Sequence, residues 1–152
     1  MVDSIEAHRQ AATCFGAITT GSGTPYVGTG GTLPSSCAAT GVAATDQGAL
    51  DAMDSWSDML TGAGETVGGN SVGAMINAVG CVSLDLGPDT TTPDMYTVAV
   101  AWQGLSDLPA PTPANDASAG EKNAAACGTG LYGNAARRRV MWTTIELAKL
   151  RS

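Results

Sequence analysis

Three segments in the second half of the chain alternate apolar and polar residues with a period of two. They cover residues 81–86, 95–102 and 140–147. In the middle segment, for example, every second position is tyrosine, valine, valine and then tryptophan. A period of two is typical of a β-strand that buries one face. The short connection at 87–93 suits a hairpin, so we expect an antiparallel sheet within residues 81–150.

Between residues 45 and 60 the periodicity is instead that of an α-helix. Apolar side chains recur on one face at Leu50, Met53, Trp56 and Leu60. Aspartates lie on the opposite face at Asp51, Asp54 and Asp58. Thr45 or Asp46 can cap the first turn, and Gly62 is suited to end the last. We predict a helix over 45–60 with a solvated acidic side to which Asp46 also belongs.

Residues 2–20 predict a second helix with a thinner apolar stripe. The residues of this stripe are Val2, Ile5, Ala12 and Phe15. A thin stripe stabilises an isolated helix poorly, so this helix needs another element to pack against. The segments 20–44 and 107–126 are rich in Gly, Ser, Pro, Ala and Asn and are expected to be long loops. Together these elements predict one α+β domain over residues 1–152.

The charge of the chain narrows its possible partners. The net charge is −7, and only 14% of the 152 residues are charged. An acidic surface repels nucleic acid, so no nucleic-acid partner is expected. Arg137, Arg138 and Arg139 nevertheless form a local basic cluster at the start of the last strand. Two interpretations remain open, a charged strand start that discourages edge pairing or a contact with an acidic neighbouring subunit.

Four widely spaced cysteines favour disulfides and therefore an oxidising compartment. No CxxC pair is present and His8 is the single histidine, so a structural zinc site is poorly supported. Three pairings are possible, and we prefer Cys14–Cys37 with Cys81–Cys127 because each joins neighbours along the chain. A cytosolic protein with four free thiols is the alternative. The sequence contains no apolar run that could serve as a signal peptide, so we expect a targeting segment upstream of Val2.

Candidate chemistry is sparse, and neither an enzyme nor a cofactor is expected. The sequence has no GxSxG or HExxH motif, and His8 is read as an ordinary helix residue. The glycine-rich stretch at 28–31 lacks the strand and the Gly-Lys-Ser/Thr of a phosphate loop. Asp85, Asp89 and Asp94 surround a turn rich in threonine and are weak calcium candidates, because acidic turns are common for conformational reasons alone.

Four short sequence blocks resemble a known family. They are Gly80-Cys81-Val82, Tyr96-Thr97-Val98-Ala99-Val100-Ala101-Trp102-Gln103-Gly104, Cys127-Gly128-Thr129-Gly130-Leu131-Tyr132-Gly133, and Arg138-Arg139-Val140. In this order they resemble the type IV pilus minor pilins of the PilV type, also called type IV pilus modification proteins. The helix that carries Trp56 is also similar. The resemblance lies between roughly Asp46 and Leu147.

The resemblance implies a fold, a function and a location. It implies an N-terminal helix packed on an antiparallel sheet of three to four strands, with residues 1–20 as the C-terminal half of the pilin helix. It implies a subunit that primes or caps a pilus, in complex with other minor pilins, the major pilin and a tip adhesin. The subunit would be held in the inner membrane, facing the periplasm, by an apolar helix that this sequence lacks, and later in the extracellular filament.

Two other functions remain open at the level of sequence. A minor pseudopilin of a type II secretion system would share the architecture and serve a different machine. A calcium- or glycan-binding adhesion domain would use the loops at 85–94 or 107–126.

Overall fold

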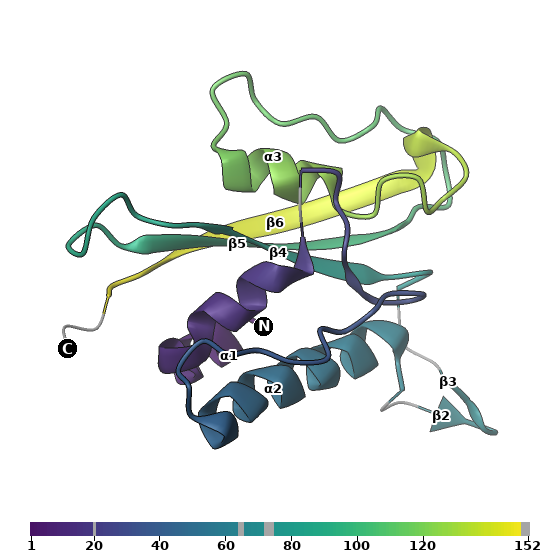
Figure 1. Ribbon diagram of the computed structural model, residues 1–152. Helices are drawn as coiled ribbons and strands as arrows, with labels where there is room; N and C mark the ends of the chain where they lie inside the picture. Colours follow the sequence, from purple (N-terminus) through teal and green to yellow (C-terminus); the bar gives the residue numbers. More distant parts are fainter. Residues whose placement is uncertain (20, 64–65, 72–74, 150–152) are drawn as a thin grey trace.

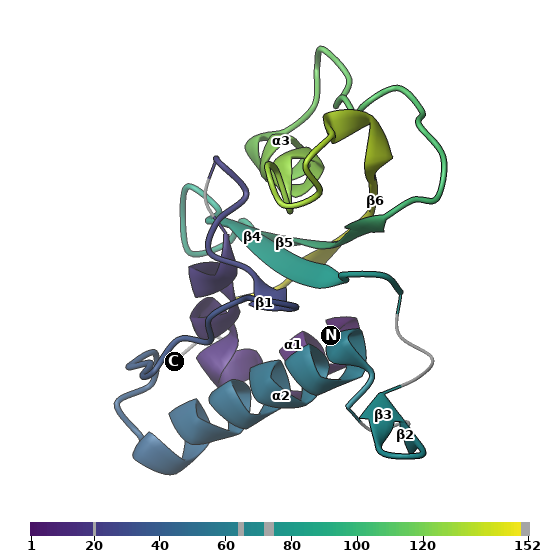
Figure 2. The same ribbon diagram turned by 90° about the vertical axis from the view of Figure 1, so that its right-hand side faces the viewer.

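A four-stranded antiparallel sheet lies between two layers of helices in the computed structural model, which describes residues 1–19, 21–63, 66–71 and 75–149. The strands, in spatial order, are β1 (Val27–Gly28), β4 (Val79–Asp85), β5 (Asp94–Gln103) and β6 (Arg138–Leu147). One face carries α1 (Val2–Ala7), η1 (Arg9–Ile18) and α2 (Ala43–Thr61), and the other carries α3 (Ala119–Ala126) (Figures 1 and 2). Smaller elements are the hairpin of β2 (Thr66–Val67) and β3 (Asn70–Ser71), and the turn η2 (Ala135–Arg137).

The three strands expected from the alternation are confirmed as β4, β5 and β6. Val82 pairs with Val98, and Val98 in turn pairs with Thr143, so these three positions form one row across the sheet. Side chains of a row point to the same face in an antiparallel sheet. The even-numbered residues of β5 therefore face α1, η1 and α2, whereas the odd-numbered ones face α3. The short strand β1 is an addition that the loop-like composition of 20–44 did not predict.

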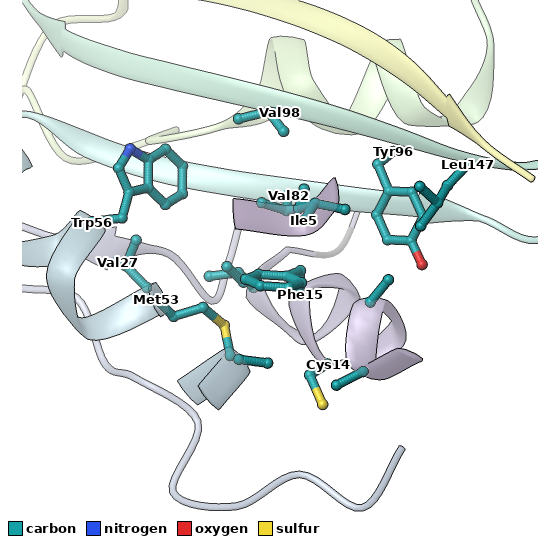
Figure 3. Packing of buried hydrophobic residues seen from close by; sticks show 14 of the residues in the cluster. Ile5, Cys14, Phe15, Val27, Met53, Trp56, Val82, Tyr96, Val98 and Leu147 are labelled. Carbon is teal, nitrogen blue, oxygen red and sulfur yellow. The ribbon is translucent and has the colours of Figure 1, made fainter. Parts of the chain in front are cut away.

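The main core lies between the sheet and the helices α1, η1 and α2. Ile5, Phe15, Met53, Val82 and Tyr96 are fully or almost fully buried there and point toward one another (Figure 3). The opposite face of the sheet is covered by α3 through small side chains: Val79, Cys81, Ala99, Ala101 and Ala124. Because α3 meets the sheet through small residues, the helix can approach the strands closely.

Helix α2 is confirmed, with two differences at its start. It begins at Ala43 after Val42, which makes no side-chain cap. Asp46 is buried and accepts hydrogen bonds from the Thr40 backbone N–H and hydroxyl, at 3.0 and 2.9 Å. The prediction that Asp46 belongs to a solvated acidic face is therefore wrong. Gly62 ends the helix in the left-handed conformation, as expected.

The single helix expected over 2–20 is wrong, because the chain changes direction at His8 (Figures 1 and 2). His8 has φ −104° and ψ 38°, and its Nδ1 lies 2.9 Å from the Ser4 carbonyl oxygen. The following segment, η1, is a 3₁₀ helix whose Gly16 leaves room for β4, since a Cβ there would lie 2.7 Å from Leu84 Cβ. The bend brings both Ile5 and Phe15 into the core, and this burial outweighs the continuous helix. Thr20 lies outside the described residues.

Helix α3 interrupts the segment 107–126, which was expected to be a loop. Ser118 Oγ accepts from the Glu121 backbone N–H at 3.2 Å, and Glu121 Oε2 accepts from the Ser118 backbone N–H at 2.9 Å. This capping box is visible in the sequence as Ser-x-x-Glu and was the missed signal. The Gly120 N–H then donates to Asp85 Oδ2 at 2.8 Å, which ties the first turn of α3 to β4.

Two disulfides tether the layers. Their pairing is the preferred one, in which each disulfide joins two cysteines that are neighbours along the chain. Cys14–Cys37 joins η1 to the segment before α2, and Cys81–Cys127 joins β4 to the end of α3. In the part of the chain that the structure describes, no helix combines the length and the apolar character needed to span a bilayer.

Candidate functional site

The four sequence blocks of the family resemblance meet where β4 and β6 begin and β5 ends, and the second block also runs back along most of β5. We call this region the motif end; it consists of residues 80–82, 96–104, 127–133 and 138–140. Cys81–Cys127 links the first block to the third. The Tyr132 hydroxyl donates to the Asn77 carbonyl at 3.1 Å, just before β4, and the Gly104 N–H donates to the Arg137 carbonyl at 2.7 Å. Blocks that lie far apart in the sequence, from Gly80 to Val140, therefore form one connected unit.

Two glycines of these blocks are required by close contacts. A Cβ on Gly80 would lie 2.3 Å from the Trp56 ring, so the absence of a side chain allows α2 to dock on β4. A Cβ on Gly104 would lie 2.9 Å from the Arg139 guanidinium. The helix that carries Trp56 thus belongs to the same unit as the motif end.

The three arginines have three different environments. Arg137 lies in η2 and forms an exposed ion pair with Asp107 at 3.0 Å. Arg139 Nη1 donates to the Ala136 carbonyl at 2.8 Å, and its Nη2 donates to the Ser106 carbonyl. These contacts fold the segment after β5 over the start of β6. Arg137 precedes β6, so it does not share a strand face with Arg139.

Arg138 points inward and is only 8% exposed. Its Nη1 donates to the carbonyls of Ala125, in α3, and Cys127, the latter at 3.0 Å. Backbone carbonyls at a helix C-terminus carry partial negative charge, which makes them suitable acceptors for a cation. Arg138 is therefore not part of an exposed basic cluster with Arg137 and Arg139.

A pocket of about 300 Å³ opens beside Arg138. It is lined by Thr129, Gly130, Tyr132, Gly133, Asn134, Ala135 and Arg138. Burial raises the pKa of Tyr132 to about 12, and the nearby Arg138 charge opposes part of that increase. The Tyr132 hydroxyl therefore stays protonated near neutral pH and continues to donate to Asn77.

Several exposed apolar side chains lie on or beside the segments of the motif end. Met75, Ile76, Leu105, Leu108 and Leu131 are among them, and we call these five the apolar rim. Leu105 is 88% exposed and Leu108 is 53% exposed. The Ile76 carbonyl accepts from the Gln103 N–H at 2.9 Å, and the Leu108 N–H donates to the Ala136 carbonyl at 2.9 Å. Apolar side chains that gather on a surface mark candidate contact sites for other proteins.

The three calcium candidates are not brought together. Asp85 accepts from the Gly120 N–H, and Asp94 pairs with Lys149 at 3.2 Å. Asp89 Oδ1 accepts from the N–H and hydroxyl of Thr91 and from the N–H of Thr92. These bonds, led by the Thr91 hydroxyl, hold the pKa of Asp89 well below its usual range. Within the described residues, no three His, Cys, Asp or Glu side chains are arranged to hold a metal ion.

His8 lines a second cavity, of about 410 Å³, between the α1–η1 bend and the start of α2. Its ring packs near Phe15, with ring centroids 6.5 Å apart, and against Gly48. Together with the contact to Ser4, this position gives His8 a role in ending α1. A third cavity, of about 300 Å³, lies beside η1 and the end of β6, where Arg9 and Lys149 are among its lining residues.

A scan against protein-family models found no match, and searches of the curated proteins and of the solved structures found none either. The motif end and its apolar rim are therefore described from the residues and contacts of this chain alone.

Proposed function

We infer that the protein is a structural minor pilin that primes or caps a type IV pilus at the filament tip. The observation that carries this proposal is the convergence of the four blocks at the motif end. The first, second and fourth blocks lie in adjacent strands, and a disulfide ties the third block to the first, so the four blocks can act as a single contact unit. The Tyr132 hydrogen bond to Asn77 adds a link to the segment before β4.

The proposed mechanism is assembly by contact and requires no turnover. An apolar helix upstream of Val2 would hold the subunit in the inner membrane and later in the filament core. The sheet and its apolar rim would remain outside that core and meet the next subunit of the tip. Leu105 and Leu108 are suited to this role, because burying exposed leucine side chains against a partner stabilises the contact.

The test is deletion of the gene in the source organism, followed by counting surface filaments by electron microscopy and measuring twitching. The expected result is a large loss of filaments that the wild-type gene restores. Leu105→Asp, in the apolar rim, should restore filaments poorly. Leu86→Asp is the matched control, because Leu86 is also exposed, at 66%, but lies at the opposite end of β4. Leu86→Asp should restore filaments fully.

Normal filaments and normal twitching in the deletion strain would refute the proposal. Intact filaments together with a loss of protein secretion would instead assign the chain to a type II secretion system. Equal rescue by Leu105→Asp and Leu86→Asp would refute the role of the apolar rim.

A further inference from the structure

The charge of Arg138 has no acidic partner in the described part of the chain. The ion pairs there join Arg137 to Asp107 and Lys149 to Asp94. Arg138 is 8% exposed and is held by two backbone carbonyls. Carbonyls offer partial charges only, so a buried guanidinium held in this way still favours a nearby anion.

The hydrogen bonds of Arg138 leave one edge of its guanidinium free. A guanidinium carries five N–H groups, and Nη1 holds two of them. Both carbonyl contacts are made by Nη1, and within the described residues Nε and Nη2 form no hydrogen bond. No buried side-chain nitrogen or oxygen there lacks a partner, so Nε and Nη2 reach accessible space. The pocket that Arg138 lines is such a space.

Nε and Nη2 together form one of the two edges with which arginine binds a carboxylate through two parallel hydrogen bonds. The other side chains of the pocket have already used donors. Tyr132 donates to Asn77, Thr129 donates to the Ala126 carbonyl at 2.6 Å, and Asn134 donates to Asp107 at 3.2 Å. A phosphate group has more oxygens than this single edge can satisfy, whereas a carboxylate has two.

We propose that the pocket beside Arg138 is a binding site for one carboxylate group, held by the Nε–Nη2 edge of Arg138. The carboxylate could belong to a small free acid or to an Asp or Glu side chain of another protein. The site does not depend on the pilus proposal, because it is tested with the isolated chain and a small ligand. Its volume of about 300 Å³ accommodates a group of this size.

The test follows the Nε–Hε signal of Arg138 by NMR during titration with sodium acetate, with sodium chloride at equal ionic strength as the reference. The expected result is a saturable shift with half-saturation in roughly the millimolar range. Ala135→Glu places a competing carboxylate at the exposed wall of the pocket and should weaken acetate binding about tenfold or more. Ala114→Glu makes the same charge change at an exposed loop residue outside the pocket lining and should bind acetate as the wild type does.

Two further ligands test the binding site: one identifies the source of the carboxylate, and the other tests whether the preferred anion is a carboxylate. N-acetyl-glutamate amide should bind at least as tightly as acetate if a protein side chain is the source, and should fail to bind if only a small acid fits; both results support a carboxylate site. Inorganic phosphate that binds more tightly than acetate would overturn the assignment to a carboxylate. A shift that never saturates, or that chloride reproduces, would overturn the site. Equal acetate binding by the wild type and Ala135→Glu would also overturn its location.

Discussion

Substituting Gly80 by alanine tests the contact that docks α2 on the sheet. The new Cβ would lie 2.3, 2.6 and 2.7 Å from three atoms of the Trp56 ring, far inside van der Waals contact. Trp56 is only 6% exposed, so its ring has little free space into which it can move. Overpacking of this kind costs about 1–3 kcal/mol.

The sign of the effect distinguishes packing from chain entropy. Gly80 lies within β4, where alanine in place of glycine should stabilise the protein by roughly 0.5–1 kcal/mol if no clash occurred. The clash is larger, so we expect Gly80→Ala to lower the free energy of unfolding by about 1–2 kcal/mol. When Trp56 is first replaced by leucine, space opens, and Gly80→Ala should then be neutral or slightly stabilising. The coupling energy between the two substitutions should be about 2 kcal/mol.

The assay is urea unfolding of the wild type, both single variants and the double variant, followed by far-UV circular dichroism. Gly21→Ala is the control, because a Cβ there would lie 3.5 Å from Asn123 Oδ1, an ordinary contact. It should change the free energy of unfolding by less than about 0.5 kcal/mol. If Gly80→Ala lowers the free energy of unfolding as much in the Trp56→Leu variant as in the wild type, the packing argument is refuted. It is also refuted if Gly80→Ala alone leaves the free energy of unfolding unchanged.

Three other predictions follow from single contacts. Asp46→Ala should destabilise the protein by about 1–3 kcal/mol in urea unfolding, because the partly buried backbone N–H and hydroxyl of Thr40 both lose their acceptor, whereas the exposed Asp54→Ala should have little effect. Dithiothreitol should reduce the disulfide of Cys37 first, since Cys37 is partly exposed and both cysteines of the other disulfide are 0% exposed. Timed alkylation followed by mass spectrometry measures the order, and simultaneous reduction of both disulfides would contradict this prediction. Thr91→Ala should raise the pKa of Asp89 toward its usual value in an NMR titration. A carboxylate with a depressed pKa stabilises the fold above its unfolded pKa and loses this effect as the pH falls through its folded pKa, so in Thr91→Ala the loss should be smaller and complete at a higher pH.

The long regular elements could be predicted because their signals are local and repeat. The sequences of β4, β5 and β6 alternate with a period of two, although β4 and the middle of β5 are buried on both faces, and α2 shows a continuous apolar face. The end of α2 at Gly62 could also be predicted, because a left-handed residue favours glycine. Helix α3 has few apolar residues to form a face, and only its capping box indicated it.

The candidate site was predicted only in part. The sequence located the arginine cluster and the cysteines but gave Arg138 the wrong environment. Alternation along a strand indicates on which face Arg138 lies. That face is covered by α3, a helix that was not predicted because the composition of 107–126 is typical of a loop. The pocket beside Arg138 also requires the turn after α3 to fold back toward β6, which no local pattern encodes.

The sequence by itself determined the α+β class, the three long strands and helix α2, because each depends on periodicity or on the order of residues along the chain. The disulfide pairing was a preference among three possibilities, and the structure decided it. The tertiary structure alone decided the bend at His8, the burial of Asp46 and the inward position of Arg138. The bend at His8 and the position of Arg138 depend on packing against other elements, and the burial of Asp46 depends on its hydrogen bonds to Thr40, six residues earlier. Burial of Ile5 and Phe15, or hydrogen bonds to buried backbone groups, contributes more free energy than the local preference costs.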